Sequence, residues 1–312
     1  MRRLALTAPL LAGFAALFLS SSQLTAQVDE SDPRFAEDPT EVSDPRTNTD
    51  PRDASARSVG QLLDELEGTE LLEALWERGS TAELSDAMRD EAWELLGWID
   101  SHCEQWLSLI EAGGMDTDAG QARAAELVDK ATRLATLADS ALKDSRFSTY
   151  VHTFTNWDSE QQLAFRGGQA HYREASQMLA SATSAEHALR ALSPLERSLA
   201  AARPLGDTWG QSMTLAAMGE VHHANKQWQA AREAMRSAVE VGRTIRDLDS
   251  VWSGYNVIVE ASIAMGEFRA ARSTLQEQYQ LSVEVGDEES EQRVIDRLVQ
   301  IEEMITRVEQ QR

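Results

Sequence analysis

The fold is decided by Gln227-Trp228-Gln229-Ala230-Ala231-Arg232, which recurs forty residues later as Glu267-Phe268-Arg269-Ala270-Ala271-Arg272. The same shift aligns Met235 with Leu275, Glu220 with Glu260, and Asp207 with both Asp247 and Asp287. Aspartate is a favoured N-cap residue, so each of the three aspartates predicts the start of a helix. One period therefore contains a helix that begins after Asp207, a turn near 225–226, and a second helix over about 227–245.

The rest of the chain from Ser58 onward is also helical in composition. Only Pro194 and Pro204 occur there, and apolar residues recur at spacings of three and four. Ser80-Thr81-Ala82-Glu83 has the spacing of a capping box and predicts one long helix to about Ile110, and a further helix is expected over 119–142. We expect 148–157, where β-branched and aromatic residues alternate, to be an ordered loop, because a single strand has no partner. The predicted fold class is all-α.

Within each forty-residue period the small and aromatic residues hold fixed places. The first convincing period has Gly219 in its first helix, Lys226 and Trp228 at the turn, and Ala231 and Ala238 in its second helix; the next period has Val259, Gly266, Phe268, Ala271 and Gln278. This arrangement resembles the tetratricopeptide repeat family in its longer form, over about 167–287. The resemblance implies a solenoid of antiparallel helix pairs. Ser193-Pro194-Leu195-Glu196 departs from it and predicts that the second helix of the preceding, weaker period is kinked or split.

The resemblance also implies a binding surface, because the first helices of such pairs line a concave face that receives a peptide or a partner helix. The family's groove positions correspond here to Arg173, Ser176, Met213, Glu220, His223, Ser253, Asn256, Glu260 and Ile263. These residues are polar and mildly acidic, which suits a protein or peptide partner with Arg, Lys or amide groups. The alternative is that Glu220 and Glu260 belong to a solvated face.

The C-terminal segment carries one apolar stripe, formed by Val294, Leu298, Ile301, Ile305 and Val308. A helix with one apolar and one polar face is what the end of a helical solenoid requires, so we expect a capping helix. The alternative is a two-stranded coiled coil that joins two copies of the chain into a homodimer, although little more than two heptads is short for one.

The N-terminal segment has the features of a secretory signal over residues 1–26. Arg2 and Arg3 precede an uncharged apolar run over 4–19, and Leu24-Thr25-Ala26 suits cleavage after Ala26. An uncleaved membrane anchor is the alternative, but the run is short for a bilayer that needs about 20 residues. Residues 27–57 repeat Asp-Pro every six residues, which predicts a disordered spacer. The mature protein is therefore expected in the periplasm or outside the cell, without a membrane span.

Catalytic or cofactor-binding motifs are scarce. The formal charge of −23 argues against nucleic-acid binding, and the single Cys103 excludes an internal disulfide and structural thiolate zinc sites. Adjacent helical residues point apart, so neither His222-His223 nor His102-Cys103 forms a chelate or a nucleophile–base pair, and His171 with Glu174 lacks a third metal ligand. We therefore predict a non-enzymatic scaffold without metal or cofactor, composed of an N-terminal helical region over 58–165 and repeats over 166–312. The alternatives are a small-ligand or enzyme site in 58–165, and an acidity that only adapts the protein to salt.

Overall fold

The computed structural model describes residues 66 and 68–311, so the predicted signal segment and the hexapeptide spacer lie outside the described residues. Every regular element in that part of the chain is a helix, which confirms the all-α prediction. The chain divides into two compact units, 1–80 and 81–312, so the predicted region 58–165 is split between them. None of the described helices is long and apolar enough to cross a membrane.

In the first unit the described element is α2 (Gly68–Arg78). It buries Leu72 and Leu75, which belong to the apolar pattern of the sequence. Gly68 and Gly79, at its two ends, both have a positive φ, of 55° and 74°, a conformation that glycine adopts without steric cost.

The second unit begins with the helices α3 (Thr81–Asp90), α4 (Leu95–Glu111), α5 (Asp118–Leu142) and α6 (Arg146–Thr155), with the short 3₁₀ turn η2 (Gly114–Asp116) between α4 and α5. The single helix predicted from Ser80 to about Ile110 is wrong. The N–H of Glu94 donates to the carbonyl of Glu91, three residues back, and this tight turn separates α3 from α4. The helix predicted over 119–142 is confirmed as α5.

The loop predicted over 148–157 is also wrong, because most of it is α6. Phe147, Tyr150, Val151 and Phe154 recur at helical spacing and are buried together. The hydroxyls of Thr149 and Thr155 donate to backbone carbonyls four residues back, so the β-branched residues that suggested a strand are accommodated in a helix.

The next helices are α7 (Ser159–Ala180), α8 (Ala185–Ala188), η3 (Leu189–Ala191) and α9 (Leu192–Leu205). The expected split of the second helix is confirmed, since α9 begins at Leu192 after two short turns. Pro194 lies in the first turn of α9, where its missing N–H costs no helical hydrogen bond. Residues 165 and 166, where we placed a domain boundary, both lie inside α7.

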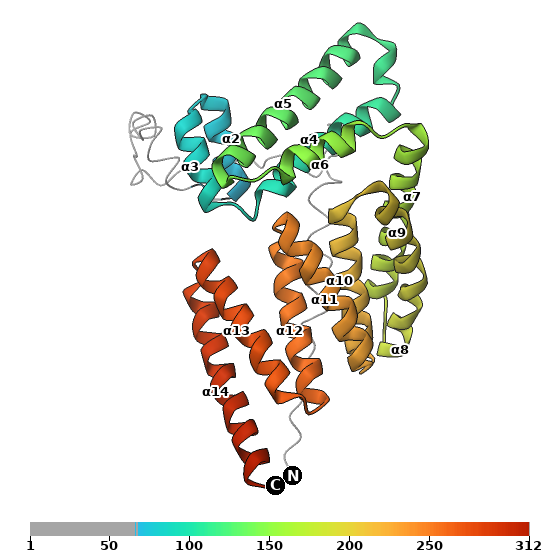
Figure 1. Ribbon diagram of the computed structural model, residues 1–312. Coiled ribbons are helices and arrows are strands. Elements are labelled where there is room, and N and C mark those ends of the chain that lie inside the picture. The colour runs from blue at the N-terminus through green and yellow to red at the C-terminus, as the bar shows by residue number, and fades with distance from the viewer. Residues whose placement is uncertain (1–65, 67, 312) are drawn as a thin grey trace, which may run out of the picture. The chain divides into compact units, whose positions relative to one another are not determined.

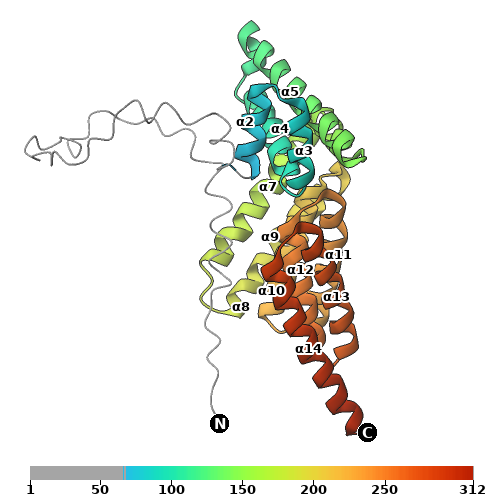
Figure 2. The same cartoon turned by 90° about the vertical axis from the view of Figure 1, so that its left-hand side faces the viewer.

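Two similar helix pairs and a final helix complete the unit: α10 (Thr208–Ala224), α11 (Trp228–Ile245), α12 (Leu248–Ala264), α13 (Phe268–Val285) and α14 (Glu288–Gln310). The predicted caps are confirmed, because the Asp207, Asp247 and Asp287 side chains accept from the backbone N–H groups of Gly210, Ser250 and Ser290. The helices stand side by side in chain order (Figure 1). Seen from the side, α10, α12 and α14 form one row and α11 and α13 another (Figure 2).

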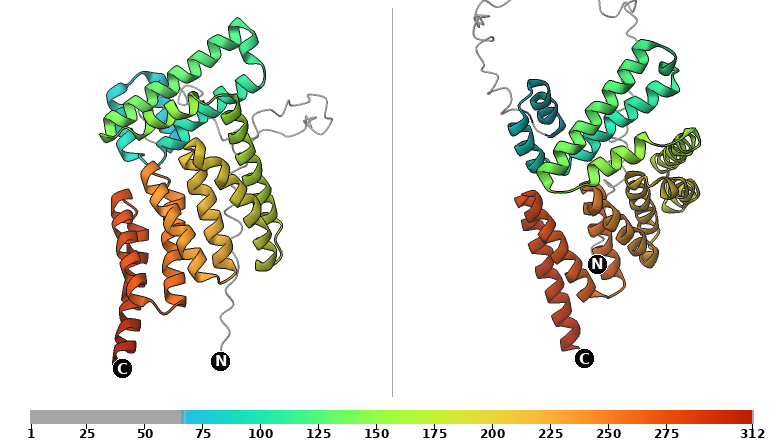
Figure 3. Two further views of the ribbon diagram at one scale, coloured as in Figure 1. Left: turned by 45° about the vertical axis from the view of Figure 1, so that its right-hand side comes forward. Right: turned by 45° about the horizontal axis from the view of Figure 1, so that its top comes forward.

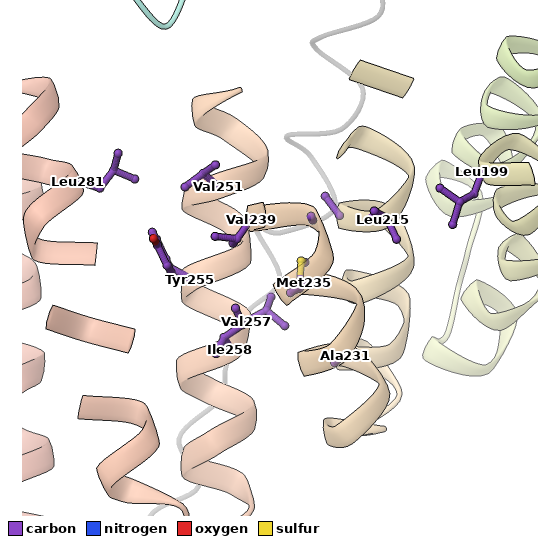
Figure 4. Packing of buried hydrophobic residues seen from close by; sticks show 12 residues of the cluster. Leu199, Leu215, Ala231, Met235, Val239, Val251, Tyr255, Val257, Ile258 and Leu281 are labelled. Carbon is purple, nitrogen blue, oxygen red and sulfur yellow. The ribbon is translucent and has the colours of Figure 1, made fainter. Parts of the chain in front are cut away.

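Small residues let these helices approach closely. A Cβ on Gly219 of α10 would lie 2.5 Å from Cγ of Met235 on α11, so any larger residue there would force Met235 to move. On the other side, Cγ2 of Val239 on α11 would lie 2.4 Å from a Cβ on Gly254 of α12. Met235, Val239, Val251 and Ile258 are all buried in one cluster (Figure 4). On α14, Val294, Ile301 and Ile305 are buried as predicted, and Leu298 packs against the same cluster.

Candidate functional site

The row formed by α10, α12 and α14 brings four of the predicted groove residues together. The Ser253 hydroxyl on α12 donates to Oε1 of Glu220 on α10 at 2.7 Å. His223 Nε2 on α10 lies 2.9 Å from Oε2 of Glu260 on α12. We call the face that carries these residues the α10–α12–α14 surface.

Asn256 extends this surface to α13 and α14. Its side-chain oxygen accepts from Nε2 of Gln278 at 2.9 Å and from Nη1 of Arg297 at 2.8 Å. Gln278 is only 1% exposed, so one of the hydrogen bonds that fix the Asn256 side chain comes from a buried amide. Because its oxygen is engaged, the Asn256 side chain has its NH₂ group to offer to a partner.

Charge is unevenly distributed over the α10–α12–α14 surface. Burial raises the pKa of Glu220, although the Ser253 hydrogen bond opposes that shift. The hydrogen bond from His223 lowers the pKa of Glu260. Since the Glu260 side chain is 53% exposed, it is a stable negative charge within reach of solvent, whereas Glu220 is only partly exposed.

The remaining predicted groove residues do not join these bonds. Met213 and Ile263 are half-buried, and Ile263 packs against the apolar cluster of α13 and α14. On α7, Arg173 is exposed and the Ser176 hydroxyl donates to the Tyr172 carbonyl of its own helix. The structure therefore brings the polar groove residues of α10 and α12 together, but not the residues of α7.

A second polar cluster joins α4, α6 and α7, and we call it the α4–α6–α7 joint. The Tyr150 hydroxyl donates to Asp100 Oδ1 at 2.5 Å. Glu104 accepts from Nη1 of Arg166 at 2.6 Å and from Nε2 of Gln169 at 2.5 Å. Figure 3 shows these helices from two further directions.

Burial perturbs the acids of the joint. Desolvation, and then the charge of Glu104, raises the pKa of Asp100 to about 8. Desolvation likewise raises the pKa of Asp207 to about 6. The pKa of Cys103 is also raised by burial, so its sulfur stays a thiol at neutral pH, and the residue is 1% exposed in the core, as predicted. At neutral pH the Asp100 carboxyl is therefore protonated and bonded to Tyr150, and the Cys103 thiol packs in the core.

The histidines of the predicted pairs each have a polar neighbour. His171 Nδ1 is 3.6 Å from Glu174 Oε2, and His222 Nδ1 is 2.6 Å from Gln227 Oε1. Among the residues that the structure describes, no group of three or more His, Cys, Asp or Glu side chains could hold a metal ion.

Sequence reasoning missed Gln278, Arg297 and Arg166. Gln278 stands where the repeat pattern expects an alanine, so this departure was a usable signal. Arg297 and Arg166 are ordinary arginines in helical patterns, and nothing in their neighbourhood marked them.

No protein-family model matches the chain, and a search of the curated proteins finds no similar one. Function has therefore to be inferred from geometry. The α10–α12–α14 surface presents an exposed carboxylate beside an anchored amide, and both are groups that recognise the polar atoms of another chain.

Proposed function

We propose that this protein is an exported, non-enzymatic scaffold of the tetratricopeptide type, which binds a protein or peptide partner along the α10–α12–α14 surface. The observation that carries the proposal is the pairing of Glu220 with Ser253 and of His223 with Glu260 across neighbouring helices. These pairs hold polar side chains in fixed positions, and such preorganisation reduces the entropy lost when a partner binds.

The chemistry of the surface suits a partner that offers cationic and amide groups. Glu260 supplies an exposed charge that can accept from Lys or Arg. Asn256 can donate to a backbone carbonyl or a side-chain amide, since its own oxygen is occupied. Export rests on the apolar N-terminal run and Ala26, which predict a cleaved secretory signal.

The alternative of a small-ligand or enzyme site in 58–165 has less support. The perturbed acids of the α4–α6–α7 joint already have partners, because Asp100 accepts from Tyr150 and Glu104 accepts from Arg166 and Gln169. A buried Cys103 with a raised pKa is a poor nucleophile.

Photo-crosslinking in the native envelope tests the proposal. A photoreactive amino acid is placed at Ile263, on the α10–α12–α14 surface, or at the exposed Glu233 of α11, in the other row of helices. We expect a discrete adduct from position 263 that is lost when Glu260→Arg reverses the exposed charge.

Glu240→Arg is the matched control, because Glu240 is an exposed residue of α11 and the charge change is the same. It should leave the adduct unchanged. Equal adducts from positions 233 and 263, or an adduct that survives Glu260→Arg while circular dichroism shows a native fold, would exclude this surface as the binding face.

A further inference from the structure

Arg246 departs from the repeat in a way that has a structural cost. The helix-end positions of successive periods are Gly206, Arg246 and Gly286, each followed by an aspartate. All three have a left-handed backbone, with φ values of 66°, 59° and 72°. Glycine adopts this conformation freely, whereas a residue with a Cβ is strained in it. Arg246 therefore occupies a position that is glycine at the two equivalent helix ends, one period before and one period after it.

The side chain of Arg246 is mostly buried and poorly satisfied. Lys143 and Lys226 also have a positive φ, but both are exposed, whereas the Arg246 side chain is 22% exposed. Its Nε is buried without a hydrogen-bond partner among the described residues. Its Nη1 lies 3.7 Å from Glu284 Oε1, which is beyond hydrogen-bond length. A guanidinium with several N–H donors is thus largely buried, and the one acidic side chain within 4 Å of it among the described residues is Glu284.

Aromatic and cationic groups surround this guanidinium. Its central carbon lies 5.7 Å from the centre of the Trp93 ring, within the range of a cation–π contact. Arg243 reaches the same carboxylate, with Nη2 3.5 Å from Glu284 Oε2. Arg146, at the start of α6, donates to the backbone carbonyl of Arg243 at 3.3 Å and pairs with Asp144.

The three arginines repel one another in this arrangement. Burial, and then the positive charge of Arg146, lowers the pKa of Arg246, while Glu284 and Asp144 oppose that shift. Two carboxylates thus face three guanidinium groups, in a chain whose formal charge is −23. A local excess of positive charge in so acidic a protein calls for an anion.

We propose that Arg146, Arg243 and Arg246 form a binding site for a small anion that carries a carboxylate or phosphate group. Guanidinium groups bind both through paired N–H donors, and Trp93 backs the guanidinium of Arg246. The ligand enters through Arg243 and Arg146, whose side chains are 43% and 32% exposed. Glu284 competes with the ligand for the same donors. This site uses the C-terminal end of α11 and the start of α6, so it is independent of the α10–α12–α14 surface.

Arg246→Gly separates this proposal from a purely structural role. The substitution copies Gly206 and Gly286, so it relieves the backbone strain while it removes the guanidinium. Binding of inorganic phosphate and of citrate to the full chain is measured by calorimetry, with chloride at equal ionic strength as the reference. We expect saturable binding of at least one anion, and the better of the two identifies the ligand as a phosphate or a carboxylate.

Arg246→Gly should weaken that binding roughly tenfold or more while leaving the melting temperature without anion unchanged or raised. Glu284→Gln should strengthen binding about threefold, because it removes the competing carboxylate. Arg236→Ala removes an exposed arginine from the same helix and should have no effect. The absence of saturable binding to either anion, or an unchanged affinity in Arg246→Gly, would overturn the proposal.

Discussion

The buried core of the helix pairs α10/α11 and α12/α13 is formed mainly by small and aliphatic side chains, whereas the α4–α6–α7 joint uses charged and aromatic ones. In the pairs, Gly219 faces Met235, and Ala231 and Ala238 are fully buried. In the joint, Asp100 and Glu104 are bonded by Tyr150 and Arg166. The first kind of contact depends on shape and the second on matched partners.

The aromatic part of the joint reinforces this contrast. The Phe154 ring centre lies 4.5 Å from that of Trp157 and 5.2 Å from that of Phe165, and Trp157 Nε1 donates to the Leu205 carbonyl. Bulky rings therefore fill the space between helices in the joint, whereas small residues let the helices of the pairs approach closely. Each region should consequently fail in its own way when a residue is changed, the pairs through volume and the joint through unpaired charge.

The largest expected effect tests whether shape alone holds the pairs. Met235→Ala, at a fully buried position, should lower the free energy of unfolding by about 3 kcal/mol through the cavity that it leaves. Gly219→Ala in the wild-type background should cost about 1 kcal/mol, since the added methyl would overlap Met235. Both values are measured by denaturant unfolding.

The double variant sharpens that test. With Met235→Ala present, the methyl of Gly219→Ala has room, and alanine favours a helix by about 1 kcal/mol over glycine. We therefore expect Gly219→Ala to stabilise the Met235→Ala protein. If the two losses in free energy of unfolding simply add in the double variant, Gly219 and Met235 do not compete for the same space. The idea that shape alone holds the pairs would then lose support.

The second prediction concerns the protonated acid of the joint. The pKa of Asp100 is about 8 in the folded protein, against 3.8 for an unperturbed aspartate, so between these values the folded state holds a proton that the unfolded chain lacks. The free energy of unfolding should then fall as the pH rises from about 4 to 8, by up to about 1.4 kcal/mol for each pH unit. The stability that the Asp100 proton contributes is fully present below pH 3.8 and is lost as the pH rises through about 8.

Asp100→Asn should remove this part of the pH dependence, because an amide does not titrate but can still accept from Tyr150. The comparison is best made between pH 6 and 8, since Asp207, with a pKa of about 6, adds its own slope below that window. There we expect the free energy of unfolding of the variant to depend less on pH, so that its difference from the wild type shifts in favour of the variant by about 2 kcal/mol between pH 6 and 8. Parallel curves would show that Asp100 ionises normally.

The forty-residue period predicted the helix pairs because the residues that start each helix and form each turn lie close together in the sequence. A forty-residue shift located the turn at Lys226 and the caps Asp207, Asp247 and Asp287, and each cap needs only a backbone N–H three residues away. The same register placed Glu220 and Ser253 on one face of successive first helices, but it did not predict the hydrogen bond between them.

The joint was not predictable in that way. Tyr150 bonds to a residue fifty positions earlier, and Arg166 to one sixty-two positions earlier, and no period relates these helices. The same lack of a repeat explains the failed loop over 148–157, where burial of Phe147 and Phe154 outweighed strand propensity. Arg246 was visible in sequence as a departure from glycine, but its neighbours Trp93 and Arg146 were not.

A third prediction compares an ion pair of the joint with one at the surface. Arg166 bonds Glu104 and Glu111, and its side chain is only 25% exposed. Arg166→Met should lower the free energy of unfolding by about 1.5 kcal/mol, because it leaves partly buried carboxylates unpaired. Arg269→Met is the control, since Arg269 pairs with Glu309 at 77% side-chain exposure and should cost less than about 0.5 kcal/mol. Equal costs would contradict the idea that matched charges hold the joint.

The smallest expected effect compares two equivalent caps. Asp287 accepts from the Ser290 N–H, whereas Asp247 accepts from the Ser250 N–H and also from the Ser212 hydroxyl at 2.8 Å. Asp287→Ala should therefore cost about 1 kcal/mol, and Asp247→Ala slightly more. Thermal unfolding of both variants measures the difference.

The pH dependence of the Asp287 cap supplies an internal check. Its hydrogen bonds with Ser290 lower its pKa below 3.8, so its contribution is present above that value and is lost as the pH falls through the folded pKa. The gap between wild type and Asp287→Ala should close in strong acid, opposite in sign to the effect expected for Asp100. If the stability difference between the wild type and Asp287→Ala persists in strong acid, the aspartate acts through backbone propensity rather than through its charge. Electrostatics would then not stabilise the helix pairs at this junction.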